Sequence, residues 1–166
     1  MRYGLVLSGL DKSEILKYYG PMMNVGIGFQ IRDDVLDLTM KKGDEKGKPV
    51  YKEQKFGKDY LGDLAEGKRT IPLVRLYEVC DPSERTFLDE NIRNGPYDPR
   101  FKRKEVSIKI RKKIVEMMNK HEVIKYANKL AKHYVNEGNN KLRELVNPQL
   151  AQPLFELNNY CVDRNF

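Results

Sequence analysis

Cysteine, histidine and long apolar runs are all scarce in this sequence of 166 residues. The two cysteines, Cys80 and Cys161, lie far apart without the paired spacing of metal ligands, so we expect reduced residues in or near the core. The two histidines, His121 and His133, have no cysteine or carboxylate at a useful spacing and are expected at solvated helix positions. This scarcity disfavours a histidine-based metal site and a nucleophile paired with histidine.

No apolar run is long enough to cross a membrane, although 40% of the residues are hydrophobic, because 33% are charged. Residues 1–4 do not open a targeting segment, so we expect a cytoplasmic protein. The net charge of +7 indicates an anionic partner: nucleic acid, acidic lipid or a phosphate-bearing small molecule. The most basic stretch, residues 102–113, has no interleaved aromatics and is typical of the solvated side of an amphipathic helix.

Strand-like alternation is absent, and helical periodicity dominates, so we predict an all-α domain that spans residues 1–166. A helix that begins near Asp11 is expected to be kinked or divided at Pro21, ahead of a helix through residues 26–38. Residues 39–69 lack sustained periodicity and are predicted to form a loop, which at this length is usually functional or disordered. Further helices are predicted at residues 70–80, 82–91, 104–120, 122–146 and 149–163.

The stretch GIGFQIRDDVLDL, residues 26–38, combines apolar residues with three aspartates. On a helix, one narrow stripe holds the four polar positions Gln30, Asp33, Asp34 and Asp37. Apolar residues flank this stripe on both sides, so it should face a cavity inside a helical assembly. Like charges that are desolvated together need a compensating cation or shared protons. The stripe therefore predicts a cation site.

A second informative stretch lies in the predicted loop, where the pairs Gly57-Lys58 and Gly67-Lys68 bracket Asp63. Glycine lets the backbone approach a ligand closely, and lysine supplies a point charge for phosphate. Alone, this pattern is typical of a flexible basic loop that binds nothing. Beside a carboxylate stripe it indicates a site for Mg²⁺ and diphosphate, because carboxylates and phosphate oxygens are the ligands that Mg²⁺ prefers.

Three motifs carry a family resemblance. GFQIRDDVLD resembles the second aspartate-rich motif of the trans-polyprenyl diphosphate synthases, which include the geranylgeranyl and farnesyl diphosphate synthases. GKDYLGDLAEGKRTIP is similar to the segment that follows this motif, and LFELNNYCVDRN resembles the family's C-terminal helix with its closing basic residue, Arg164. The resemblance implies a helical bundle of the isoprenoid synthase type. Members are longer and carry an earlier aspartate-rich motif on a facing helix, so this chain resembles a C-terminal half that lacks the N-terminal helices.

The resemblance implies a Mg²⁺-dependent prenyltransferase that condenses isopentenyl diphosphate with an allylic diphosphate. The catalytic residues would be Asp33, Asp34 and Lys68. The metal ligands would be Asp33, Asp34, Asp37 and Asp63, and the diphosphate would be bound by Gln30, Lys58, Lys68 and Arg164. The implied partners are the two diphosphates together with a homo-oligomer or the missing N-terminal half.

Three alternatives stay open: a class I terpene cyclase, a non-catalytic subunit of a complete synthase, and a basic helical protein that binds nucleic acid. The last leaves the aspartate stripe unexplained. Because only one aspartate helix is encoded, we expect no prenyl transfer by the chain alone. We also expect a missing partner helix to leave exposed the apolar residues that flank the stripe, namely Ile27, Phe29, Ile31 and Leu38.

Overall fold

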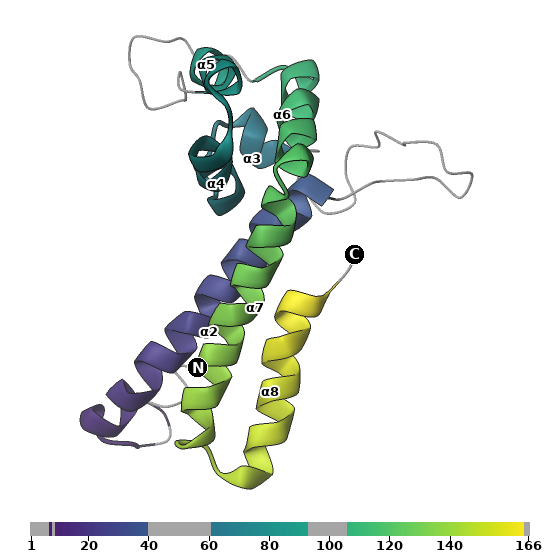
Figure 1. Ribbon diagram of the computed structural model, residues 1–166. Coiled ribbons are helices and arrows are strands. Elements are labelled where there is room, and N and C mark those ends of the chain that lie inside the picture. The colour runs from purple at the N-terminus through teal and green to yellow at the C-terminus, as the bar shows by residue number, and fades with distance from the viewer. Residues whose placement is uncertain (1–6, 8, 40–60, 93–105, 165–166) are drawn as a thin grey trace. The chain divides into compact units, whose positions relative to one another are not determined.

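The structure is a computed structural model that describes residues 7, 9–39, 61–92 and 106–164, apart from the side chain of Leu150. Within these ranges the chain forms helices and no strand (Figure 1), which confirms the predicted all-α fold. The helices are α2 (Lys12–Thr39), α3 (Gly62–Ala65), α4 (Ile71–Val79), α5 (Pro82–Asn91), α6 (Ile108–Lys120), α7 (Val123–Arg143) and α8 (Pro148–Asp163).

The chain divides into two compact units. Unit 1 combines Met1–Asp33 with Asn128–Asn165, and unit 2 comprises Asp34–Ala127 together with Phe166. The extent of one domain over residues 1–166 stays a prediction. In the described part of the chain, no helix is long and apolar enough to cross a membrane. Both cysteines are free and half-buried, as expected.

Unit 1 is held together by close packing of α2 against α7. A Cβ atom added to Gly28 would lie 2.6 Å from the carbonyl oxygen of Ala131, and one added to Gly138 would lie 2.7 Å from the carbonyl oxygen of Pro21. Two glycines, one on each helix, therefore let the backbones approach. Pro21 lies inside α2 and is buried there, so the alternative that it divides the helix is wrong. Packing against α7 offsets the backbone hydrogen bond that a proline removes.

Helix α8 joins unit 1 through buried amides as well as apolar side chains. Asn158 Nδ2 donates to Asn139 Oδ1 at 2.7 Å, and Asn139 Nδ2 donates to Asn159 Oδ1 at 3.1 Å. Both Asn139 and Asn158 are buried, and such groups must be paired to avoid a desolvation penalty. Val25 of α2 and Phe155 of α8 belong to one core cluster, so α8 contributes to the same core as α2.

Unit 2 is built around α6, which contacts α3, α4 and α5. Its core includes both Met117 and Met118. Thr70 is the N-cap residue of α4 and Pro72 stands in its first turn, where a proline costs no intrahelical hydrogen bond. Helix α3 lies within residues 39–69, which the sequence predicts to be a loop. The prediction did not include this helix because four residues are too few to show a periodic pattern.

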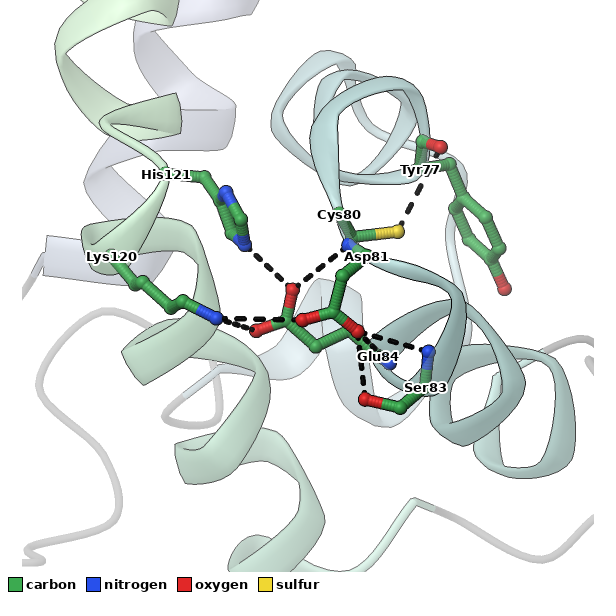
Figure 2. Close-up of polar contacts among 7 residues, drawn as sticks. All are labelled: Tyr77, Cys80, Asp81, Ser83, Glu84, Lys120 and His121. Atoms are coloured by element: carbon green, nitrogen blue, oxygen red, sulfur yellow. Dashed lines mark hydrogen bonds and ion pairs between the residues drawn. The ribbon is translucent and has the colours of Figure 1, made fainter.

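Polar contacts join the start of α5 to the end of α6 (Figure 2). Asp81 caps α5: its carboxylate accepts from the backbone N–H of Ser83 and of Glu84, each at 2.9 Å. Glu84 Oε2 accepts in return from the N–H of Asp81 at 3.1 Å, which completes a capping box. The N–H of Glu84 is the main reason why the pKa of Asp81 lies well below its usual range.

Glu84 also contacts Lys120, the last residue of α6, and His121, its C-cap residue. Lys120 Nζ donates to Glu84 Oε1 at 2.9 Å, and His121 Nε2 lies 2.6 Å from Glu84 Oε2. Lys120, and to a smaller extent His121, lowers the pKa of Glu84. The expectation that His121 is solvated is wrong, since this contact half-buries it, whereas His133 is exposed as expected. We name Asp81, Glu84, Lys120 and His121 the Glu84 cluster.

Candidate functional site

The carboxylates of α2 lie at low exposure. Asp34 is 9% exposed and Asp37 is 7% exposed, while the side chain of Asp33 is 31% exposed. Their apolar neighbours Ile31 and Leu38 are buried. That burial contradicts the expectation that Ile31 and Leu38 are left exposed, because contacts within this chain already cover both.

The other residues named around the stripe differ in exposure. Phe29 is exposed as expected, and Ile27 is half-buried. Gln30 is exposed on α2. The family resemblance assigns Gln30 to diphosphate binding, and that assignment stays a prediction. Lys58 lies outside the described residues.

Asp33 meets Arg164 within unit 1. Arg164 Nη2 donates to Asp33 Oδ1 at 2.9 Å, and its guanidinium lies 4.5 Å from the centre of the Phe29 ring. Arg164 is the C-cap residue of α8, so the end of that helix delivers the guanidinium to the aspartate-rich part of α2. The structure thus brings together two residues that the resemblance assigned to one site, although 131 positions separate them.

Arg32 supports this arrangement, and sequence reasoning missed it. Its Nη2 donates to the carbonyl oxygen of Arg164 at 2.7 Å, and its Nη1 donates to Asn128 Oδ1 at 2.5 Å. Arg32 is 8% exposed, and burial together with the charge of Arg164 lowers its pKa, although a guanidinium stays protonated. A charged residue inside an apolar helix, next to an aspartate pair, was the available signal. Arg32 is a positioning residue that holds the end of α8.

Asp37, Asp63 and Lys68 are linked within unit 2. The backbone N–H of Asp63 donates to Asp37 Oδ2 at 3.2 Å, and Lys68 Nζ donates to Asp63 Oδ1 at 2.8 Å. Lys68 also lies 3.1 Å from Glu66 Oε2. The bond to Asp63 is the main cause that raises the pKa of Lys68. Lys68 therefore holds the α3 turn in this structure and presents a half-exposed cation beside it.

The backbone around α3 has two left-handed residues. Gly67 has a φ of 67°, which suits glycine and lets the chain turn directly before Lys68. Leu61 has a φ of 55°, which strains a residue with a branched side chain, and its complete burial in the core of unit 2 offsets that strain. The α3 turn is therefore anchored from both ends.

The carboxylate oxygens of the aspartates suit Mg²⁺, but in the described residues they do not form a complete coordination site. Within the described ranges, no group of three or more His, Cys, Asp or Glu side chains is placed to hold a metal ion. The aspartates of α2 supply only carboxylate oxygens, the hard ligands that Mg²⁺ takes from proteins one or two at a time. The remaining ligands would have to come from elsewhere, and phosphate oxygens are of the right kind.

An all-α fold with a carboxylate-rich helix next to basic side chains defines a narrow class of protein, and the family comparison agrees. The family model described as polyprenyl synthetase matches residues 1–108. The chain belongs to the polyprenyl synthetase family.

Two curated relatives carry the printed names of prenyl diphosphate synthases. The chain is 33% identical to geranylgeranyl diphosphate synthase of Saccharolobus solfataricus over 137 residues, which is 81% of the chain and 34% of that protein. It is 28% identical to octaprenyl diphosphate synthase of Haemophilus influenzae over 163 residues, or 98% of the chain and 43% of the relative. The chain thus spans less than half the length of these relatives.

A solved structure has the same fold. The crystal structure of a polyprenyl synthase from Caulobacter crescentus superposes with a TM-score of 0.74 at 22% identity. The match covers 99% of this chain and 44% of that one. The predicted helical bundle of the isoprenoid synthase type is confirmed.

Proposed function

We propose that this chain provides the C-terminal half of the active site of a prenyl diphosphate synthase, which condenses isopentenyl diphosphate with an allylic diphosphate. The observation that supports it best is the hydrogen bond from the guanidinium of Arg164 to Asp33, which lies in the family's aspartate motif. Asp34 and Asp37 of the same motif are buried. Names of relatives support the reaction type. The cytoplasmic localisation expected from the sequence belongs to the same proposal.

In this proposal Asp33, Asp34 and Asp37 bind Mg²⁺, with Asp63 as a further ligand. Bound Mg²⁺ supplies charge neutralisation for the departing diphosphate. Arg164 and Lys68 donate hydrogen bonds to diphosphate oxygens, and Lys58 and Gln30 add to the same set. Arg32 keeps Arg164 in place through its carbonyl. These side chains stabilise the negative charge that grows on the leaving group as the allylic cation forms, and no protein nucleophile is needed.

Mg²⁺ should bind to this chain through diphosphate rather than strongly alone, because no described cluster completes a coordination shell. Calorimetric titration with Mg²⁺, with and without pyrophosphate, tests this. We expect heat of binding with both ligands and little with Mg²⁺ alone. The double variant Asp33→Asn/Asp34→Asn should lose the pyrophosphate-dependent signal, and Glu116→Gln, at an exposed position of α6, is the control. Tight Mg²⁺ binding without phosphate would count against the proposal.

The alternative role is a non-catalytic subunit of a complete synthase. The two roles differ in turnover once the remaining half is supplied. We expect no product from the chain alone with geranyl and isopentenyl diphosphates, and product when the chain is co-expressed with the N-terminal part of a related synthase. Product from the isolated chain that Asp33→Ala abolishes would overturn the half-site proposal. Binding to a partner without any gain in turnover would favour the subunit role.

A further inference from the structure

The ion pair between Arg164 and Asp33 in unit 1 engages a carboxylate that the proposed function assigns to Mg²⁺. Arg164 Nη2 donates to Asp33 Oδ1 at 2.9 Å. The side chain of Asp33 is 31% exposed and that of Arg164 is 15% exposed, so the pair is within reach of solvent. The charge that would attract a divalent cation to Asp33 is therefore balanced by a guanidinium, although the carboxylate stays accessible.

A second guanidinium adds positive charge beside this pair. Arg32 precedes Asp33 on α2, and burial together with the charge of Arg164 lowers its pKa, so the two guanidiniums lie close enough to repel each other. Asp163 has the opposite effect on Arg32, but its own carboxylate lies 2.6 Å from Lys132 Nζ. A divalent cation that approaches Asp33 meets this positive charge, whereas an anion such as diphosphate compensates it.

The side chain of Arg164 can leave Asp33 without releasing α8. The backbone carbonyl of Arg164 accepts a hydrogen bond from Arg32 Nη2 at 2.7 Å. Earlier in α8, the buried amide of Asn158 donates to Asn139 of α7 at 2.7 Å. These contacts hold the end of the helix independently of the ion pair. The guanidinium can therefore change its acceptor while the backbone of Arg164 stays in place.

We propose that Arg164 couples the binding of Mg²⁺ to the binding of diphosphate. Without diphosphate, its guanidinium stays on Asp33 and keeps the affinity of this carboxylate for Mg²⁺ low. Diphosphate offers the guanidinium new acceptor oxygens, so Asp33 becomes available to the metal while Arg164 binds phosphate. The inference rests on the proposed function and adds an order to it: Mg²⁺ binds together with diphosphate and not ahead of it.

Phe29 stabilises the guanidinium in its position on Asp33. The centre of its ring lies 4.5 Å from the guanidinium of Arg164, which is within the range of a cation–π interaction. Phe29→Leu removes this attraction and leaves every charge of the chain unchanged. The variant therefore separates the position of the guanidinium from its contribution to the net charge.

The test measures metal binding and pyrophosphate binding separately in the full chain. Mn²⁺, which takes the same oxygen ligands as Mg²⁺, is titrated alone and followed by water-proton relaxation. Calorimetry then gives the affinity for pyrophosphate in Mg²⁺. Arg164→Ala should raise the affinity for Mn²⁺ alone by about tenfold and lower the affinity for pyrophosphate by about tenfold.

Two further variants serve as a refinement and a control. Phe29→Leu should raise the affinity for Mn²⁺ alone by about two- to fivefold, with a smaller loss of pyrophosphate affinity than Arg164→Ala, because the guanidinium is retained. Lys129→Ala removes one positive charge from an exposed position of α7 in unit 1 and should change either affinity by about twofold or less.

Unchanged or weaker Mn²⁺ binding by Arg164→Ala or by Phe29→Leu overturns the proposal. Equal gains in Arg164→Ala and Lys129→Ala also overturn it, because they would assign the effect to the net charge. Failure of the proposed function gives a different result: the wild-type chain would bind no pyrophosphate in Mg²⁺, or would bind it equally well after Asp33→Asn/Asp34→Asn. Intact wild-type binding without a gain in the Arg164 variant refutes the coupling alone.

Discussion

The two units of this chain differ in how completely their own residues cover their apolar side chains. In unit 2, one core cluster contains eleven buried residues drawn from α2 through α7, including fully buried Leu73 and Leu76. In unit 1, the described surface exposes Leu7, Leu10, Leu16, Tyr19, Met23, Phe29, Leu157 and Tyr160, whereas that of unit 2 exposes Ile71, Val74, Ile108 and Tyr126. Among the described residues, unit 1 therefore leaves more large apolar side chains exposed than unit 2 does.

The largest difference between the units should come from truncating one leucine in each. Leu76→Ala removes a fully buried side chain from unit 2 and should lower the free energy of unfolding by about 2–5 kcal/mol. Leu16→Ala, at an exposed position of α2 in unit 1, should change it by about 0.5 kcal/mol or less, because little is lost from an exposed position. Urea unfolding followed by circular dichroism measures both. Similar losses would mean that Leu16 is covered in the free chain.

A smaller effect is expected where unit 1 is closely packed. Gly28→Ala places a methyl group within 2.6 Å of a backbone oxygen of α7 and should destabilise the chain by about 1–3 kcal/mol. The matched control is Gly26→Ala, two residues earlier, where a Cβ meets nothing within 4 Å. It should stabilise the helix by about 0.5–1 kcal/mol. Thermal unfolding of the pair would reveal the contrast, and equal midpoints would argue against the helix contact.

The proposed function assigns diphosphate binding to one cation in each unit, and the two can be compared. Arg164→Ala in unit 1 and Lys68→Ala in unit 2 should each weaken pyrophosphate binding in Mg²⁺ by about tenfold, as expected for the loss of a charged hydrogen bond. Lys112→Ala, an exposed position on basic α6, serves as the control. Calorimetry measures the three affinities. The same loss in all three variants would indicate a diffuse positive field rather than a site.

The smallest effect concerns the Glu84 cluster and acid pH. Because Lys120 holds the pKa of Glu84 below its ordinary value, the folded state binds its proton less readily than the unfolded state. Ionised Glu84 therefore stabilises the folded state fully above the ordinary pKa of a glutamate, about 4.3. This stabilisation is lost as the pH falls through the lower pKa that Glu84 has in the folded state. Glu84→Gln should flatten the fall of the melting temperature on the acid side, whereas Glu116→Gln should not. Identical acid profiles for the two variants would exclude this contribution.

Most helix boundaries were predictable because they depend on local signals. Thr70 followed by Pro72 is a pattern typical of a helix start, and α4 begins there. The predicted helix at residues 149–163 differs from α8 by one residue at its start. The sequence also placed Asp33 and Arg164 in one neighbourhood, but only through the family resemblance. Contacts between residues that are distant in the sequence and belong to no motif could not be predicted. Arg32 reaches Asn128 and His121 reaches Glu84 across 96 and 37 positions, and no periodicity records such pairs.

The exposure of the α2 flanks was mispredicted for a related reason. Sequence periodicity shows which residues share a face, but it does not show which face the rest of the chain covers. Ile31 and Leu38 are enclosed by contacts within this chain, and Leu16, Tyr19 and Met23 are not. The same limitation applies to α3, whose four residues are positioned by the bond between the Asp63 N–H and Asp37 rather than by a local pattern.

The contact between Arg164 and Asp33 makes the length of α8 more constrained than its composition. Gln152 and Leu157 are exposed, so substitutions at these positions should have little effect on stability. Inserting or deleting one residue between Asn147 and Arg164, however, turns the last residue by about 100° around the helix axis and carries its guanidinium away from α2. Natural variation in this helix should therefore consist of substitutions, with gaps confined to the turn before it.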